Sequence, residues 1–269
     1  MLRIELRRAF KSKSFYVAMF IGLVIALGQY FENVLPMVKY LDMDLKKNVY
    51  PHSIFNKWLG GEYYTVWPML FYFILPVIAV LPYGDSFYRD IQTGYIKNIF
   101  IRVERKKYLK AKLAAVYLTG MTTVMFPLVL NLLLSAATLP ALVPAPSTGF
   151  FFIFDQNMWS ELFLTHPWIY NIIYILLDGL FGGLFACIAL AGTLYVSGRF
   201  VAAILPFTVQ ITVYVIAMNF PELSPVGFLS PTQPVGADIR IILLEIIAMT
   251  AVVYLLYYRK GIKDEMLEI

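Results

Sequence analysis

Six long apolar runs constrain this chain of 269 residues more than any other feature of its sequence. A helix rises about 1.5 Å per residue, so roughly 20 mainly apolar residues cross the ~30 Å hydrocarbon core of a bilayer. Only 14% of the residues are charged, and the mean hydropathy is +0.71. The runs cover residues 15–36, 66–83, 113–138, 168–195, 200–219 and 239–258. The sequence therefore predicts an all-α integral membrane protein, with residues 1–269 forming a single transmembrane domain.

Lys and Arg are unevenly distributed between the segments that flank these runs. Seventeen of the 22 fall in residues 1–14, in residues 85–112, at Arg199 and in residues 259–269. Positive residues accumulate on the cytoplasmic side of membrane proteins, where anionic headgroups also attract them. We therefore expect a multi-pass protein of the cell membrane, in contact with the lipid bilayer, with both termini in the cytoplasm. Residues 1–14 would form a basic, amphipathic interfacial helix, and residues 259–269 a cytoplasmic tail.

The segment 85–112 carries eight Lys or Arg side chains. Its apolar residues recur at intervals of three and four, with a break at Gly94, which predicts two short amphipathic helices joined at that glycine. These apolar residues are Phe87, Ile91, Tyr95, Ile96, Ile99, Phe100 and Val103. The charge could simply fix topology, and the helices could lie among lipid headgroups or dock into a groove of a soluble partner. Periodicity alone does not separate these possibilities.

Two acidic residues lie well inside predicted spans, away from their ends. Asp178 lies in the fourth run and Glu245 in the sixth. A carboxylate in hydrocarbon costs about 2.5 kcal/mol or more on insertion scales, so each should face protein or water. Each could be an ion or proton site, or a structural acid hydrogen-bonded to a neighbouring helix. Gly179 and Gly183 form a GxxxG pattern, which favours close helix packing within the chain or between two copies.

Several catalytic and binding motifs are missing from the sequence. It contains no GxxxxGK[ST] phosphate-binding loop, no HExxH and no GxSxG. The two histidines, His52 and His166, fall in separate predicted outer loops without a cysteine nearby, and the single cysteine is Cys187. We therefore expect a non-catalytic chain that holds no cofactor or metal of its own and binds no nucleic acid.

Two basic stretches of this chain are similar, in their residue types and in their order along the sequence, to segments of a known protein family. The chain begins with the basic stretch MLRIELRRAFKSKSFY, and its second run continues into LPYGDSFYRDIQTGYIKNIFIRVERKKYLKAKLAAVY. With six spans and cytoplasmic termini, this order resembles the permease subunit of a type-2 ABC transporter. The positions that carry the resemblance are Asp85, Arg89, Asp90, Gly94, Ile99, Phe100, Arg102 to Lys107, and Lys112. Many members have a proline soon after the apolar pair, whereas this chain reads Ile101, Arg102 and Val103, which leaves the subfamily and the cargo open.

The resemblance implies an ATP-driven exporter. Residues 85–103 would be the coupling helix that enters a cleft of a separate ATP-binding subunit, which would hold the ATP and Mg²⁺. The ATPase-coupling residues would be Asp90, Gly94, Ile96, Ile99, Phe100 and Arg102, with the apolar side chains as the main contact. A second permease copy or a related chain would complete the translocation path.

The sequence also suggests a kind of cargo, and it leaves two functional classes open as alternatives to an exporter. Aromatic residues of the predicted outer loops would suit an interfacial belt or an amphiphilic cargo such as a peptide, an antibiotic or a lipid-like molecule. They are Tyr40, Tyr50, Phe55, Trp58, Tyr63, Tyr64 and the run GFFFIF at 149–154. The first alternative class is an ion-coupled secondary transporter that uses Asp178 and Glu245. The second is a membrane sensor or assembly factor that transports nothing.

Overall fold

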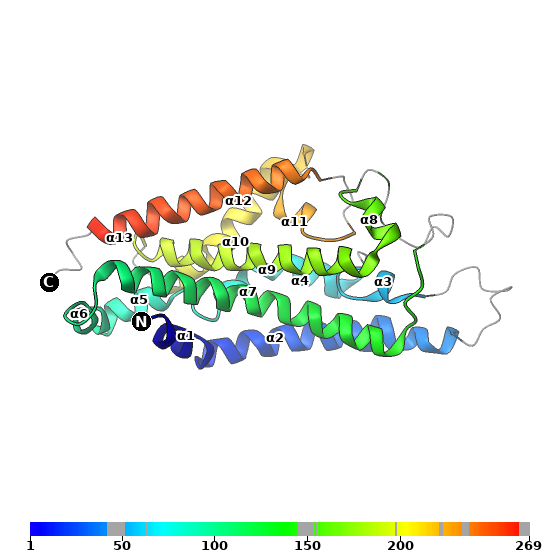
Figure 1. Cartoon of the computed structure of the whole chain (residues 1–269), viewed down its shortest axis with the longest axis horizontal. Helices are drawn as coiled ribbons and strands as arrows, with labels where there is room; N and C mark the ends of the chain where they lie inside the picture. Colours follow the sequence, from blue (N-terminus) through cyan, green and yellow to red (C-terminus); the bar gives the residue numbers. More distant parts are fainter. Residues whose placement is uncertain are drawn as a thin grey trace.

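The computed structural model describes residues 1–41, 52–62, 64–144, 153, 155, 157–196, 198–220, 223–232 and 237–263. In these residues the regular secondary structure is entirely helical, and the long helices run side by side in an elongated bundle (Figure 1). One end of the bundle carries α1, α5, α6 and α13, and is called the α1 end here. The other end carries α3, α8 and α11, and is called the α3 end.

The elements have the following bounds in chain order. They are α1 (Leu2–Phe10), α2 (Lys13–Gln29), η1 (Tyr30–Val34), η2 (Leu35–Tyr40), α3 (Ile54–Lys57), α4 (Val66–Val80), α5 (Ser86–Gln92), α6 (Tyr95–Phe100), α7 (Arg105–Thr138), α8 (Ser160–Thr165), α9 (Pro167–Gly192), α10 (Arg199–Ile216), η4 (Ala217–Asn219), α11 (Pro225–Phe228), α12 (Ile239–Val253), η6 (Tyr254–Arg259) and α13 (Lys260–Lys263).

Among the residues that the structure describes, five helical stretches are long and apolar enough to cross a membrane, which indicates a multi-pass membrane protein. They are Lys13–Tyr40, Arg105–Thr138, Pro167–Gly192, Arg199–Ile216 and Ile239–Ile262, and each overlaps one of the predicted runs. The remaining run, 66–83, contains α4, whose 15 residues are apolar but extend only about 22 Å. The third of the predicted spans begins earlier than expected, because α7 continues unbroken from Arg105 through the basic residues.

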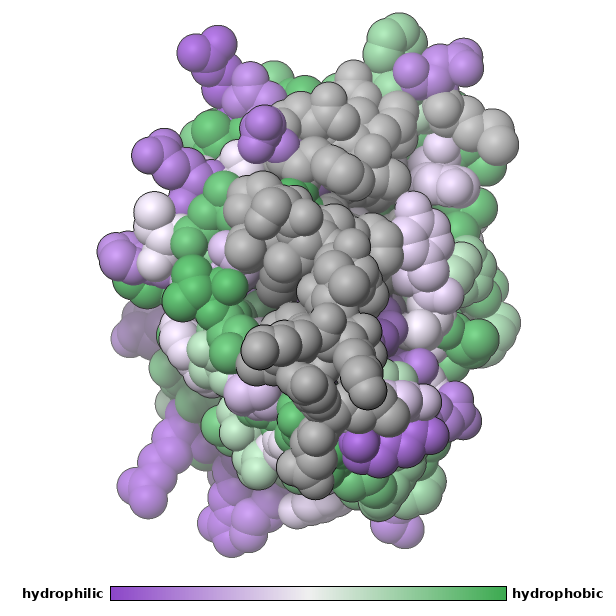
Figure 2. All heavy atoms as spheres, turned by 90° about the vertical axis from the view of Figure 1, so that its right-hand side faces the viewer, coloured by the Kyte–Doolittle hydropathy of each residue, from purple (hydrophilic) through white to green (hydrophobic). Residues whose placement is uncertain are grey.

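The α4 helix begins where its apolar run begins, at Val66, and ends three residues before the run does, at Val80, while the chain before it packs inside the α3 end of the bundle. Trp58 is fully buried there and Phe55 is 2% exposed, so these two aromatic side chains do not form the interfacial belt considered from the sequence. Tyr64 is 73% exposed. Residues 42–51, Tyr63, residues 149–152 and Phe154, which hold several of the other loop aromatics, lie outside the described residues. Figure 2, which looks onto the α3 end, shows hydrophobic side chains reaching the outer flanks of the bundle.

The most extensive helix contact in the described part of the bundle joins α7 to α9, and small residues lie in it. A Cβ added at Gly120 would lie 2.7 Å from the Ala186 Cβ and 2.9 Å from the Gly182 carbonyl oxygen. A Cβ at Gly179 or at Gly183 would meet side chains of α7 at 2.6 Å and 2.5 Å. Of the two packing alternatives for the GxxxG pattern, the structure shows the one within the chain, because glycines let the two backbones approach closely.

The segments with most of the basic residues lie together at the α1 end. Met1 lies beside α1 at this end, and so does α13, where the Lys260 Nζ donates to the Leu194 carbonyl oxygen at 3.1 Å (Figure 1). The predicted pair of short helices is confirmed as α5 and α6. Gly94 joins them with φ of +68°, a left-handed conformation that favours glycine.

Candidate functional site

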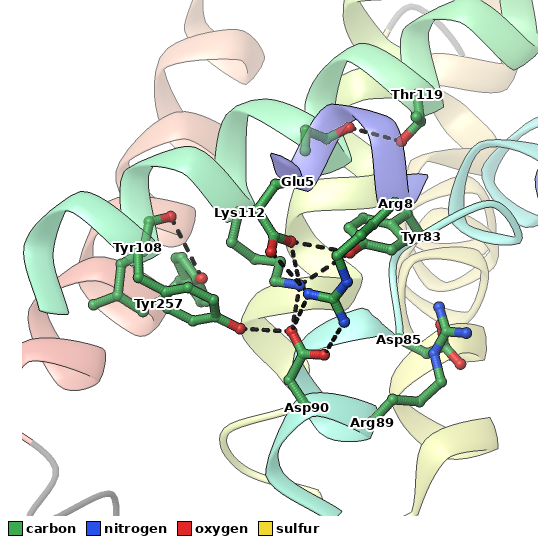
Figure 3. A network of polar contacts seen from close by, with 12 residues as sticks. Glu5, Arg8, Tyr83, Asp85, Arg89, Asp90, Tyr108, Lys112, Thr119 and Tyr257 are labelled. Carbon is green, nitrogen blue, oxygen red and sulfur yellow. Dashed lines mark hydrogen bonds and ion pairs between the residues drawn. The ribbon is translucent and has the colours of Figure 1, made fainter. Parts of the chain in front are cut away.

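Four charged side chains from three helices meet inside the α1 end (Figure 3). Glu5 and Arg8 come from α1, Asp90 from α5, and Lys112 from α7. Glu5 and Lys112 are fully buried, and the Asp90 side chain is 2% exposed. We call these four residues the ion-pair cluster. Its two acids and two bases balance each other, so the buried charge is neutral overall.

Lys112 lies at the centre of the cluster. Its Nζ lies 2.6 Å from the Glu5 Oε2 and 2.5 Å from the Asp90 Oδ2, and it donates to the Tyr83 Oη at 3.2 Å. An ammonium group has three N–H donors, and each has an acceptor here. Lys112 therefore joins the beginning of α7 to α1 and to α5 with no donor left over.

Asp90 accepts hydrogen bonds from Arg8 and Tyr108 as well as from Lys112. Arg8 binds it in a bidentate manner, with Nη2 to Oδ1 at 2.5 Å and Nη1 to Oδ2 at 3.2 Å. The Tyr108 hydroxyl donates to the Asp90 Oδ2 at 2.6 Å. Burial by itself raises the pKa of the Asp90 carboxyl, but the hydrogen bonds and positive charges of Arg8 and Lys112 outweigh it and lower this pKa below its usual value. Asp90 is therefore a carboxylate at neutral pH.

Glu5 completes the cluster on the α1 side. Its Oε1 accepts from the Arg8 Nη1 at 2.8 Å, and its Oε2 accepts from the Tyr83 hydroxyl at 3.0 Å. The Arg8 guanidinium also lies over the Tyr95 ring, 4.1 Å from its centroid. The first residue of α6 is thus held against α1. Because α1, α5 and α7 share buried charges, moving one of these helices alone would separate them at a high cost in energy.

A second set of ion pairs fixes the beginning of α5. Asp85 pairs with Arg199, the first residue of α10, and with Arg89 one turn further along α5. Arg199 is 56% exposed, so this link is more screened by solvent than the ion-pair cluster. The segment around α5 and α6 is nevertheless connected by charge to α1, α7 and α10.

The apolar residues predicted to contact a partner mostly face the chain itself. Ile96 is 2% exposed and belongs to the core of the α1 end. Ile99 and Phe100 are half-buried, and the Phe100 ring packs edge-on against Tyr108 with centroids 5.7 Å apart. The adjacent Ile101 is 83% exposed. The amphipathic stripe is therefore largely buried by this chain, because an apolar periodicity does not say which surface covers it.

The other predicted coupling residues differ in accessibility. The Asp90 carboxylate is committed to the ion-pair cluster, whereas the Arg102 side chain is exposed beyond the end of α6. A Cβ added at Gly94 would meet nothing within 4 Å, so this glycine is needed for its backbone conformation and not for space. The exposed surface at this end of the segment consists mainly of Ile101, Arg102 and the exposed part of α6.

The two intramembrane acids occupy different places. Asp178 is fully buried, and its Oδ2 accepts a hydrogen bond from the Tyr72 hydroxyl of α4 at 3.4 Å, while its Oδ1 has no partner in the described part of the chain. Glu245 is half-buried on α12. No ion pair or hydrogen bond among the described residues joins these two acids, so the structure does not bring them together as one site.

The sequence interpretation missed Glu5, Arg8, Tyr83 and Tyr108, whereas it named Asp90 and Lys112 only through a family resemblance. A signal for Glu5 was present, since it is the single acid in a strongly basic stretch and has Arg8 three residues further on. The tyrosines carried no such signal, because their role depends on which helices meet at this end of the bundle.

The described residues contain no group of three or more His, Cys, Asp or Glu side chains that could hold a metal ion. The site consists of the buried ion pairs described above, with exposed basic side chains beside them. Comparisons with family models, with curated proteins and with solved structures gave no match in any of the three.

Proposed function

We propose that this chain is the membrane subunit of an ATP-driven exporter, a permease of the type-2 ABC kind, which works with a separate ATP-binding subunit. Two copies, or one copy and a related chain, would form the path for an amphiphilic cargo in the cell membrane. The cytoplasmic side would be the α1 end, because the basic segments gather there. The chain itself would be non-catalytic, with ATP and Mg²⁺ bound by the partner.

The observation that carries this proposal is the attachment of the α5–α6 segment. The ion-pair cluster joins it to α1 and α7, and the pair of Asp85 with Arg199 joins it to α10. A force applied to the exposed side of α6 would therefore move α7 and α10 together as a rigid unit. Such transmission is what a subunit driven from outside needs, and packed helices respond to it by switching between discrete arrangements.

Exposed helices of the bundle support a partner within the membrane. In α10 and in the helix Ile239–Ile262, only 17% and 11% of the most apolar stretch is buried. These helices would be covered by lipid or by the second permease subunit. The exposed aromatic residue Tyr214 and the half-buried Phe207 of α10 would suit a path for an amphiphilic cargo.

The test is a pulldown of the tagged full-length chain from its native membrane in mild detergent, with ATPase activity measured in the eluate. We expect an ATP-binding subunit at about one per permease. Ile101→Asp should lose this subunit, because a buried apolar contact would receive a charge, while Lys106→Ala should retain it as an exposed control. Unlike Ile96→Asp, the Ile101 variant leaves the folded core of this chain intact.

Two results would refute the proposal. A chain that purifies alone, with no ATPase activity, would favour an ion-coupled transporter, and Asp178 and Glu245 would then be the residues to replace. Co-purification of a soluble protein that lacks ATPase activity would favour a sensor or an assembly factor. Loss of the ATPase from the Lys106→Ala variant but not from Ile101→Asp would contradict the assigned docking surface.

A further inference from the structure

A cavity of about 1080 Å³ opens between α1 and α5 at the α1 end of the bundle. Its wall includes six basic side chains: Arg3, Arg7, Arg8, Lys11, Lys13 and Arg89. Its one acid is Asp90, whose charge is already balanced inside the ion-pair cluster. The cavity therefore carries a large positive charge that the protein itself does not neutralise.

Four of these six cations are available to a ligand. Arg8 and Arg89 pair with Asp90 and with Asp85, but Arg3, Arg7, Lys11 and Lys13 form no ion pair with any residue that the structure describes. Arg3, Arg7 and Lys11 follow one another at intervals of four residues along α1 and its C-terminal cap. This interval places them on one side of the helix, the side that lines the cavity.

One buried hydroxyl also lacks a partner in this cavity. Ser86 is 1% exposed and lines the wall, and its Oγ has no hydrogen-bond partner among the described residues. A buried hydroxyl without a partner is uncommon, and an oxygen-rich anion in the cavity would accept a hydrogen bond from it. The cavity thus offers guanidinium groups, ammonium groups and a hydroxyl, which are the hydrogen-bond donors that proteins use to bind phosphate groups.

The surface beyond the cavity indicates the source of the phosphate. Lys13 is the first residue of α2, and the next turns of α2 expose Tyr16, Val17 and Phe20 by 61%, 50% and 64%. A charged cavity that leads directly onto an apolar, lipid-facing strip matches a molecule with a phosphate at one end and acyl chains at the other. A free phosphate would use the cavity but not the strip.

From this geometry we propose that the cavity binds the phosphate headgroup of an anionic lipid of the inner leaflet. Arg7, Lys11 and Ser86 would contact the phosphate, and the acyl chains would follow the exposed face of α2. Bound lipid would hold α1 against α5, so that the attachment of the α5–α6 segment to the bundle would depend on the surrounding membrane.

The test measures the affinity of the full-length, detergent-purified chain for phosphatidylglycerol and for phosphatidylcholine, by lipid-dependent thermal stabilisation and by native mass spectrometry. A ligand that binds only the folded state raises the unfolding temperature according to its concentration and affinity. We expect phosphatidylglycerol to stabilise the wild type and phosphatidylcholine not to do so. Arg7→Ala combined with Lys11→Ala should weaken phosphatidylglycerol binding about tenfold or more.

The matched control removes the same number of charges elsewhere. Lys97→Ala combined with Lys106→Ala replaces two exposed lysines outside the cavity and should change the affinity by less than about twofold. Ser86→Ala removes a hydroxyl that bonds to no described residue, so it should weaken lipid binding several-fold while the unfolding temperature without lipid stays unchanged.

Three outcomes would overturn the proposal. Equal weakening by both double variants would show a general charge effect and no site. Equal stabilisation by both lipids would exclude recognition of the anionic headgroup. Stabilisation by inorganic phosphate that equals the effect of the lipid would identify a soluble phosphate compound as the ligand. None of these outcomes depends on an ATPase partner, so the proposed function and this site can fail separately.

Discussion

Replacement of Lys112 by methionine is expected to destabilise the folded chain strongly. The Lys112 side chain is fully buried, and its Nζ forms ion pairs with the Glu5 and Asp90 carboxylates at 2.6 Å and 2.5 Å. Methionine has a similar length and fills most of the same volume. The effect should therefore come from charge and not from a cavity.

The magnitude follows from what remains in the cluster. Without Lys112, the two buried carboxylates share one cation, Arg8, and water cannot reach Glu5, which is fully buried. Removing one partner of a buried ion pair typically costs about 3–5 kcal/mol, because the other charge is left uncompensated. Since Arg8, Tyr83 and Tyr108 still donate to the carboxylates, we expect about 3 kcal/mol.

The assay is SDS titration of the purified chain in mild micelles, which measures the free energy of unfolding. Lys106→Met serves as the control, because Lys106 is exposed and forms no ion pair in the described part of the chain. The double variant Lys112→Met with Glu5→Gln removes one base and one acid, and leaves Arg8 paired with Asp90. Because the double variant restores the balance of charge, its loss of unfolding free energy should be about 1–3 kcal/mol smaller than the sum of the losses in the two single variants.

Additive effects in this double-variant cycle would refute the reasoning, because residues that share one buried charge balance must be coupled. A loss below about 1 kcal/mol for Lys112→Met would also contradict it, since that value is typical of a solvent-exposed pair. Equal losses for Lys112→Met and Lys106→Met would indicate a general effect of the net charge of the chain.

Three further predictions concern other parts of the fold. Because the pKa of Asp90 is lower in the folded chain, its contribution to stability is complete above its unfolded pKa of about 3.9 and is lost as the pH falls below that value. The stability difference between wild type and Asp90→Asn should thus be constant from pH 8 to about pH 5 and shrink below about pH 4, and a difference that grows with acidification would contradict it. Gly120→Ala should cost about 1–3 kcal/mol in an SDS titration, because its Cβ would meet the Gly182 carbonyl oxygen at 2.9 Å, whereas Thr122→Ala should cost little, because Thr122 is only half-buried and its hydroxyl donates to the Leu118 carbonyl oxygen of the same helix. Asp178→Asn should fold and transport normally, since an amide oxygen can still accept from Tyr72, and loss of transport by a stably folded variant would assign Asp178 a functional role.

The sequence predicted the helical framework well, for reasons that are local. A long apolar run must be helical to satisfy its own backbone in lipid, so the positions of the spanning helices follow from hydropathy alone. The break at Gly94 could also be predicted, because a glycine between two amphipathic helical patterns marks a change in the direction of the chain. The end of α4 was harder to anticipate: the helix begins at Val66, as the apolar run predicts, but it ends at Val80, and the last apolar residues of the run lie in a turn that leads into α5.

Hydropathy and the distribution of charge along the chain are enough to predict the membrane-spanning character, the helical segments and the gathering of basic residues on one side. Which charges are buried and which are free depends on how the helices pack. Glu5 and Lys112 lie far apart in the chain, and their ion pair exists because α1 folds back against α7. The stripe through Ile96 is equally ambiguous in sequence, because periodicity states that a face is covered and not what covers it. Burial and charge pairing are properties of contacts between distant segments, and those contacts arise only when the helices pack.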